Sequence, residues 1–275
     1  MLYNQKILQK RGVQYLKTKY WYHDYADEII FNIIERKEFP CPFSQLAVKR
    51  NNLIFSFVED NSASALRQSA DDLREYLARA AQWDGNLATA EPLLMVFNAD
   101  HFKADTVEGY HAMGWSILQY WHDHDPAPWP SNVSTDPHSP FWSMCFNRAQ
   151  IFVNMSNPAH ISRRSRNLGR AMTFVINPRE RFDRVAGDTV QGRKIRALVR
   201  DRIEAFDLIP HSPDLGSYQA GELEWVQYGL VDHNRPRQGG CPFHSHAKLI
   251  EGDDLALLST GKLEEGIPTH PRKTA

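Results

Sequence analysis

The sequence has few cysteines and no long apolar run, and each absence excludes a class of protein. Its 275 residues include three cysteines, Cys41, Cys145 and Cys241, none of them in a Cys-x-x-Cys pair. Because an odd and widely spaced set cannot form a disulfide framework, it favours a reducing compartment. No stretch approaches the roughly 18 apolar residues of a membrane helix, and the first residues lack the apolar core of a signal peptide. The sequence therefore predicts a cytoplasmic protein without membrane contact.

The chain also lacks an excess of charge of either sign and the glycine-rich loops of nucleotide-binding proteins. Its 32 Lys and Arg against 33 Asp and Glu give a net charge of −1. Nucleic-acid surfaces normally carry a clear positive excess, so we expect no nucleic-acid partner. Neither Gly-x-Gly-x-x-Gly nor Gly-Lys-Ser/Thr occurs, which argues against a phosphate-cradling loop.

Hydrophobic periodicity predicts helices and strands in alternation. Apolar residues at helical spacing and short apolar runs are the signals used for each. Helices are expected at 23–37, 62–77, 107–121 and 190–206, strands at 52–58, 93–97 and 171–176, and a hairpin at 141–155. Because the hairpin and the strand at 171–176 are adjacent along the chain, they favour a mixed, partly antiparallel sheet. We therefore expect an α+β fold with surrounding helices, a single domain over residues 1–260 and a disordered polar tail at 261–275.

The segment 154–169 carries the most informative chemistry. An apolar run stops at Asn157-Pro158, His160 follows, and Arg163, Arg164 and Arg166 lie within six residues of it. One imidazole beside three guanidinium groups suits a large anionic cofactor, because imidazole ligates metal while arginine pairs with carboxylates or phosphates. A solvated basic helix face explains the same residues without function. The residue types alone leave both interpretations open.

Two further segments accompany this one. They are Phe39-Pro-Cys-Pro-Phe43, and Ser212-Pro-Asp-Leu-Gly216 followed by Gly221-Glu-Leu-Glu-Trp-Val-Gln-Tyr228. Together the three segments resemble the YqcI/YcgG family, in particular its haem-dependent N-hydroxylase branch. That branch includes the arginine hydroxylase of cycloserine biosynthesis and the N-hydroxylase of guanitoxin biosynthesis. The resemblance runs from about residue 39 to residue 243, most of the chain.

The resemblance implies a monooxygenase that N-hydroxylates a guanidino group in a specialised biosynthetic pathway. L-arginine is the leading substrate and N-omega-hydroxy-L-arginine the product. Haem b would be held without covalent attachment, because Cys-x-x-Cys-His is absent. His160 would be the axial ligand, with His244 as the fallback, and Arg163, Arg166 and Arg164 would face the propionates.

Further partners follow from the same resemblance. The reaction would use O2 or peroxide, and an external electron donor is expected because the chain shows no flavin or iron–sulfur module. The sequence identifies neither that donor nor the distal-pocket residue. It leaves the oligomeric state open, with a homodimer as one option.

Two carboxylates are candidates for binding the substrate. Glu222 and Glu224 are flanked by Trp225 and Tyr228. Aromatic walls with carboxylates would hold a guanidinium by stacking and by paired hydrogen bonds, and Asp214 is a third possible partner. An amphipathic surface segment explains the same residues without function, so both interpretations stay open.

Other functions remain as alternatives. The His-x-His pairs at 122–124 and 244–246, with a nearby carboxylate, would suit a non-haem iron oxygenase. A haem-binding sensor or carrier without turnover would use the Cys-Pro step at Cys41 to control occupancy, and the arginines would also suit a phosphate-binding regulator. We assign no chemical role to Cys41 or Cys241 from the sequence.

Overall fold

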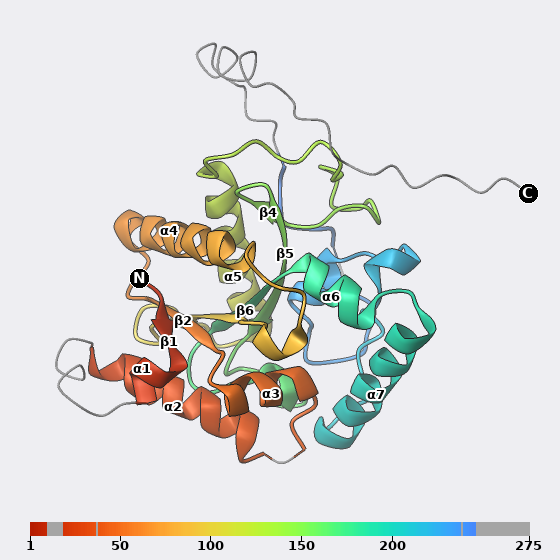
Figure 1. Ribbon diagram of the computed structural model, residues 1–275, viewed down its shortest axis with the longest axis horizontal. Helices are drawn as coiled ribbons and strands as arrows, with labels where there is room; N and C mark the ends of the chain where they lie inside the picture. Colours follow the sequence, from red (N-terminus) through yellow and green to blue (C-terminus); the bar gives the residue numbers. More distant parts are fainter. Residues whose placement is uncertain (10–18, 37, 238, 246–275) are drawn as a thin grey trace, which may run out of the picture.

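The computed structural model describes residues 1–9, 19–36, 38–237 and 239–245, which form one mixed sheet with helices on both faces (Figure 1). The sheet order is β1-β2-β3-β6-β5-β4; β2 and β3 run parallel, and the other neighbouring pairs are antiparallel. The strands are β1 (Tyr3–Asn4), β2 (Ile54–Val58), β3 (Leu93–Phe97), β4 (Cys145–Phe146), β5 (Ala149–Ser156) and β6 (Thr173–Pro178). The predicted α+β fold with a mixed sheet is confirmed. The predicted tail at 261–275 lies outside the described residues.

Three of the long helices begin where the sequence supplies a capping side chain. Ser62, Thr106 and Thr189 each accept a hydrogen bond from a backbone N–H of the first turn that follows. The helices are α1 (Gln5–Gln9), α2 (Tyr20–Ile34), α3 (Pro42–Arg50), α4 (Ala63–Ala80), α5 (Val107–Asp123), α6 (Arg179–Ala186), α7 (Val190–Phe206) and α8 (Trp225–Tyr228), with 3-10 turns η2 (Leu87–Thr89), η3 (Arg164–Arg166) and η4 (Tyr218–Ala220). None of the helices within the described ranges is long and apolar enough to cross a membrane.

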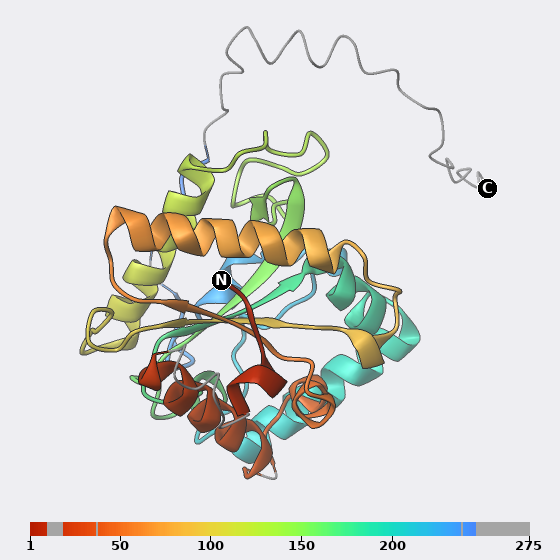
Figure 2. The same ribbon diagram turned by 60° about the vertical axis from the view of Figure 1, so that its left-hand side comes forward.

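The central strand β3 divides the core into two clusters. Leu93, Met95 and Phe97 belong to the cluster that includes α4 and α5, whereas Leu94 and Val96 belong to the cluster that includes α2 and α3. This alternation follows from the two-residue period of a strand. Figure 2 shows α4 on one side of the sheet and α1 and α2 on the other.

The predicted hairpin exists, but its first arm is short. Asn147 and Arg148 form the turn with φ values of 48° and 65°, the left-handed conformation of a tight hairpin turn. The first arm, β4, has two residues because residues 141–144 leave the sheet and bury Trp142 and Met144 in the core instead. The sequence patterns did not predict α3 or α6.

A close approach of α5 to β5 positions the region around the end of β5. A Cβ on Gly114 would lie 2.7 Å from the Sδ atom of Met155, so only glycine fits without a shift of that side chain. Met155 is the last but one residue of β5, and the loop 157–163 follows at once. The first half of α5 therefore lies against the segment that carries His160.

Candidate functional site

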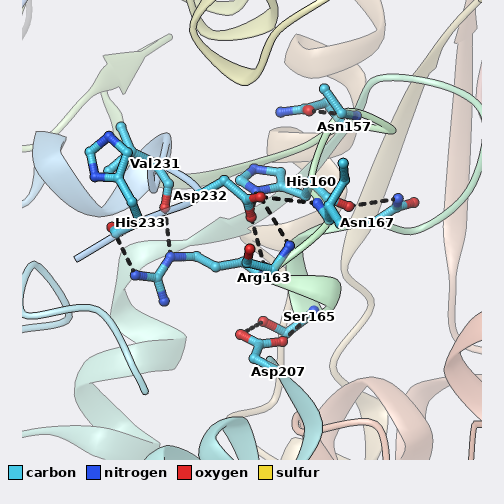
Figure 3. A network of polar contacts seen from close by, with 12 residues as sticks. Asn157, His160, Arg163, Ser165, Asn167, Asp207, Val231, Asp232 and His233 are labelled. Atoms are coloured by element: carbon cyan, nitrogen blue, oxygen red, sulfur yellow. Dashed lines mark hydrogen bonds and ion pairs between the residues drawn. The ribbon is translucent and has the colours of Figure 1, made fainter. Parts of the chain in front are cut away.

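His160 is buried and held by a carboxylate from a distant part of the chain. Its side chain is 0% exposed, and its Nδ1 lies 3.2 Å from Oδ1 of Asp232. The same carboxylate accepts hydrogen bonds from the backbone N–H groups of Ile161 (3.1 Å), Ser162 (2.9 Å) and Arg163 (2.7 Å). Figure 3 shows Asp232 between His160 and the backbone of this turn. Asp232 thereby fixes both the loop and the imidazole.

The electrostatics of this pair select one tautomer of His160. Burial lowers the pKa of His160, and the hydrogen bond that its Nδ1–H donates to Asp232 only partly opposes this effect, so the ring is neutral at pH 7. Burial by itself would raise the pKa of Asp232, but the hydrogen bonds from His160 and three N–H groups hold that pKa well below its usual range. A neutral ring beside an ionised carboxylate carries its proton on Nδ1. The lone pair of His160 therefore lies on Nε2, which is buried and has no hydrogen-bond partner among the described residues.

The three arginines beside His160 occupy three different environments. Arg163 is 1% exposed, and its guanidinium donates to the main-chain carbonyls of Val231 (2.6 Å), Pro210 (3.3 Å) and His233 (3.2 Å) and to the side chain of Asn234. It therefore fastens the segment 231–234 to the loop that carries His160. These contacts occupy all three of its guanidinium nitrogens.

Arg166 is also buried but has fewer partners. Its guanidinium donates to the carbonyls of Gln227 (3.2 Å) and Tyr228 (3.5 Å), and within the described residues it forms no ion pair. Burial and the nearby Arg163 lower its pKa to about 10, so it remains a cation at neutral pH. Arg164 is exposed, lies over the ring of Phe206 at 5.2 Å and donates to its carbonyl.

His111 on α5 is a second buried histidine and lies beside His160. The sequence interpretation missed it. Its ring centroid lies 5.9 Å from that of His160, and its Nε2 also has no partner within the described part of the chain. Burial is the first cause that lowers its pKa to about 3; the protonated form of His160 and the cations Arg237 and Arg166 lower it further. His111 is three residues before the inward-facing Gly114, and this spacing is the sequence signal that could have identified it.

The predicted substrate carboxylates differ in their accessibility. Glu224 is buried, and its Oε1 accepts from the hydroxyls of Ser143 (2.7 Å) and Tyr228 (2.6 Å). Its Oε2 pairs with Arg179, whose guanidinium stacks 3.3 Å from the ring centroid of Tyr218. Carboxylate and aromatic ring thus do surround a guanidinium, but it is one from this chain.

The two neighbours of Glu224 lie in contrasting positions. Glu222 is exposed and accepts one hydrogen bond from the backbone N–H of Ser217 at 2.6 Å. Trp225 is buried, with Arg237 over its ring at 5.3 Å and its indole nitrogen without a partner in the described chain. The role of these residues in substrate binding stays a prediction.

The remaining candidates lie apart from His160. His244 is exposed beside Gln119, and the pair at 244–246 lies partly outside the described residues. His122 is buried against Trp129, whereas His124 is exposed, so this pair does not face one site. Across the described ranges, no group of three or more His, Cys, Asp or Glu residues is placed to hold a metal ion.

Cys41 and Cys241 lie in different surroundings. Cys41 caps α3 by accepting a hydrogen bond from the N–H of Ser44 at 3.4 Å. Burial raises the pKa of Cys241 to about 11, so its thiol is protonated at neutral pH. Cys241 therefore presents no thiolate without a further change in its surroundings.

The fold and the site define an α+β protein with a neutral, carboxylate-oriented histidine buried at the end of a sheet strand. The chain belongs to the YqcI/YcgG family, whose sequence model matches residues 30–244. The resemblance seen in the three sequence segments is thereby confirmed.

The curated relatives cover most of the chain. It is 49% identical over 223 residues to "Putative N(omega)-hydroxy-L-arginine synthase DcsA" of Streptomyces lavendulae, a match that spans 81% of this chain and 84% of that protein. It is 30% identical over 208 residues to the uncharacterized protein YcgG of Bacillus subtilis (74% and 80% covered), and 31% identical over 231 residues to YqcI of the same organism (80% and 89%). No solved structure gives a significant match.

Proposed function

We propose that this protein is a haem-dependent monooxygenase that converts L-arginine to N-omega-hydroxy-L-arginine. The reaction is supported by the 49% identity, over four-fifths of both chains, to the protein named "Putative N(omega)-hydroxy-L-arginine synthase DcsA". The cofactor is supported by one observation above all. The Nε2 lone pair of His160 is buried, lacks a partner in the described chain and is fixed by the bond from Nδ1 to Asp232.

Three features of the site support the proposal of a haem group. Metal-ligating histidines usually donate their second N–H to a carboxylate, as His160 does to Asp232. Buried polar atoms normally have partners, yet Nε2 of His160, Nε2 of His111 and Nδ2 of Asn157 have none among the described residues. Arg166 adds a buried cation that forms no ion pair with any described residue, and a propionate would neutralise it.

The roles of the chain's own groups follow from this geometry. His160 would hold the iron through Nε2, Asp232 would keep the proton on Nδ1, and Arg166 would bind a propionate. Haem, when bound, supplies the activation of O2 or peroxide, with electrons from an external donor.

The first experiment tests cofactor and reaction together. The purified protein, expressed with a haem precursor, is incubated with L-arginine, a reductant and O2, and mass spectrometry follows the gain of one oxygen atom. We expect a Soret band, multiple turnovers of arginine, and loss of both in His160→Ala. Citrulline is the control substrate, because it has the same backbone but no guanidino group.

The possible results separate the alternatives. Haem binding without turnover of any guanidino compound would support a sensor or carrier instead. Protein-bound iron without a Soret band would support a non-haem oxygenase. Oxidation of a modified guanidine but not of arginine would remove only the assignment of the substrate.

A further inference from the structure

We propose that His111 and His160 form a paired site, in which His111 provides a second nitrogen ligand to the same iron as His160. This inference rests on the proposed haem cofactor and adds to it a residue from α5 for the opposite side of the iron. It is carried by the position of the two rings and by their unpaired nitrogens.

The separation of the two rings suits a shared metal. Their centroids are 5.9 Å apart with an angle of 50° between the planes. Two imidazoles on opposite sides of one metal have centroids about 6 Å apart, because each metal–nitrogen bond is about 2.0–2.1 Å and each nitrogen lies about 1 Å from the ring centre. The two planes need not be parallel, since each ring can rotate about its own metal–nitrogen bond.

Both rings present the same unpaired atom. Nε2 of His111 and Nε2 of His160 are buried and have no hydrogen-bond partner among the described residues. Leaving a buried polar atom unpaired costs about 1–3 kcal/mol, so two such atoms at adjacent rings indicate a group that would satisfy both. His23, another buried histidine, bonds to the carbonyl of Leu8 at 2.7 Å. The lack of partners is therefore a property of this pair and not of buried histidines in this chain generally.

Packing holds the ring of His111 in place from two directions. A Cβ on Gly229 would lie 3.0 Å from both Cγ and Cδ2 of His111, so the imidazole lies directly against the main chain there. Three residues further along α5, Gly114 gives the close approach to Met155 described above. The ring is thus positioned by α5 and by the segment after α8, without a hydrogen bond to Nε2.

A second histidine ligand has consequences that can be measured. With two histidines the resting iron is six-coordinate and low-spin, and a small ligand such as cyanide or carbon monoxide must displace His111. The apparent affinity for that ligand equals its intrinsic affinity multiplied by the fraction of molecules in which His111 is dissociated. If His111 is dissociated in about one molecule in ten, its removal should increase the affinity roughly tenfold.

The experiment compares the haem-loaded protein with three variants by absorption and EPR spectroscopy. We expect a low-spin spectrum for the wild type, and a high-spin spectrum with haem retained for His111→Ala. Added imidazole should restore the low-spin spectrum in that variant, and carbon monoxide should bind to it about tenfold more tightly. His111→Gln is the second variant, in case the alanine variant does not fold.

His122→Ala is the matched control, because His122 is a buried histidine on the same helix and lies against Trp129 and Phe243 instead. It should keep the wild-type spectrum. A high-spin wild type, or identical spectra in the wild type and both His111 variants, would overturn the pairing while leaving the proposed oxygenase in place. A folded wild type that binds no haem would overturn both proposals.

Discussion

At the scale of single residues, Asp232 determines whether His160 can act as a ligand. Its carboxylate accepts hydrogen bonds from Nδ1–H of His160 and from three backbone N–H groups at once. We expect Asp232→Asn to weaken haem binding roughly 10–100-fold, because loss of a partner that orients a ligand typically has that effect. Haem titration followed at the Soret band measures it. Asp207→Asn is the control, since Asp207 bonds to Ser165 and not to His160; equal affinities in both variants would contradict the role of Asp232.

Alanine substitutions of the three arginines near His160 should have different effects, because the three side chains lie in different environments. Arg166→Ala removes a buried donor, and a charge-assisted hydrogen bond contributes roughly 1.5–3 kcal/mol, so haem affinity should fall roughly tenfold or more. Arg164→Ala should retain wild-type affinity because that side chain is exposed. Arg163→Ala should mainly lower the free energy of unfolding, because its guanidinium binds main-chain carbonyls. Equal affinities in the first two variants would remove Arg166 from the propionate site.

The sequence predicted the grouping of these arginines but not their roles. A spacing of three residues places positions 163 and 166 on one side of a 3-10 turn, and both side chains are buried while Arg164 is not. The carbonyl partners of Arg163 could not be predicted, since Pro210, Val231 and His233 lie 47 to 70 residues away in segments without regular structure.

Burial of His111 should make the haem-free protein sensitive to mild acid. The pKa of His111 is about 3 in the folded protein, whereas an unfolded histidine titrates near 6.5. Below about pH 6.5 the unfolded chain therefore binds a proton that the folded chain does not. The contribution of His111 to the free energy of unfolding is fully present above that pH. It falls by up to about 1.4 kcal/mol per pH unit as the pH drops toward 3. His160 contributes in the same direction, since its pKa is also lowered.

Urea unfolding between pH 7 and pH 5 checks this expectation. The loss of stability on acidification should be smaller in His111→Gln than in the wild type. Carboxylates contribute mainly below this range, because their unfolded pKa values are near 4. The same pH dependence in both proteins would show that His111 is not held neutral by burial.

At the scale of elements, the crossing of α5 over β5 depends on a single small residue. A side chain at Gly114 would meet Sδ of Met155 at 2.7 Å and Cζ of Phe174 at 3.3 Å. Gly114→Val should therefore lower the free energy of unfolding by about 1–3 kcal/mol, the usual cost of overpacking. Met155→Ala makes room at the same place, so the double variant should lose less than the sum of the single losses. Additive losses in urea denaturation would mean that the two residues do not share this contact.

The elements most visible in the sequence are those with capping residues and clear periodicity. Helices α4, α5 and α7 start beside Ser62, Thr106 and Thr189, and strand β3 occupies the predicted residues 93–97. Helix α6 was missed because its eight residues are mostly charged, although two of its arginines are buried. Its burial depends on tertiary partners such as Glu224, which local periodicity does not reveal.

The site itself was only partly visible, for a related reason. His160 stands out because it follows an Asn-Pro break and precedes the arginines. His111 is one polar residue on an otherwise apolar helix face, and such a pattern is typical of an ordinary core position. Asp232 lies 72 residues from His160 in a segment without periodicity, so no local signal connects the two.

At the scale of the whole molecule, three separate parts of the chain meet around His160. They are the first half of α5, the loop after β5 and the segment that follows α8. The last of these has little regular structure and is fastened by the buried guanidinium of Arg163 and by the partly exposed carboxylate of Asp232. A group bound between these parts would link them and favour the folded state over the unfolded one.

Haem should therefore raise the thermal stability of the whole chain. A ligand that binds only the folded state at about 100 times its Kd adds about 2.7 kcal/mol, and for a chain of this size each 1 kcal/mol raises Tm by about 2–4 °C. We expect hemin to raise Tm by roughly 5–10 °C in the wild type, measured by circular dichroism so that haem absorbance does not interfere. His160→Ala should show little of this shift, and His111→Ala should show an intermediate one because one of two ligands remains. An equal shift in the wild type and in His160→Ala would mean that hemin stabilises the protein from a different site.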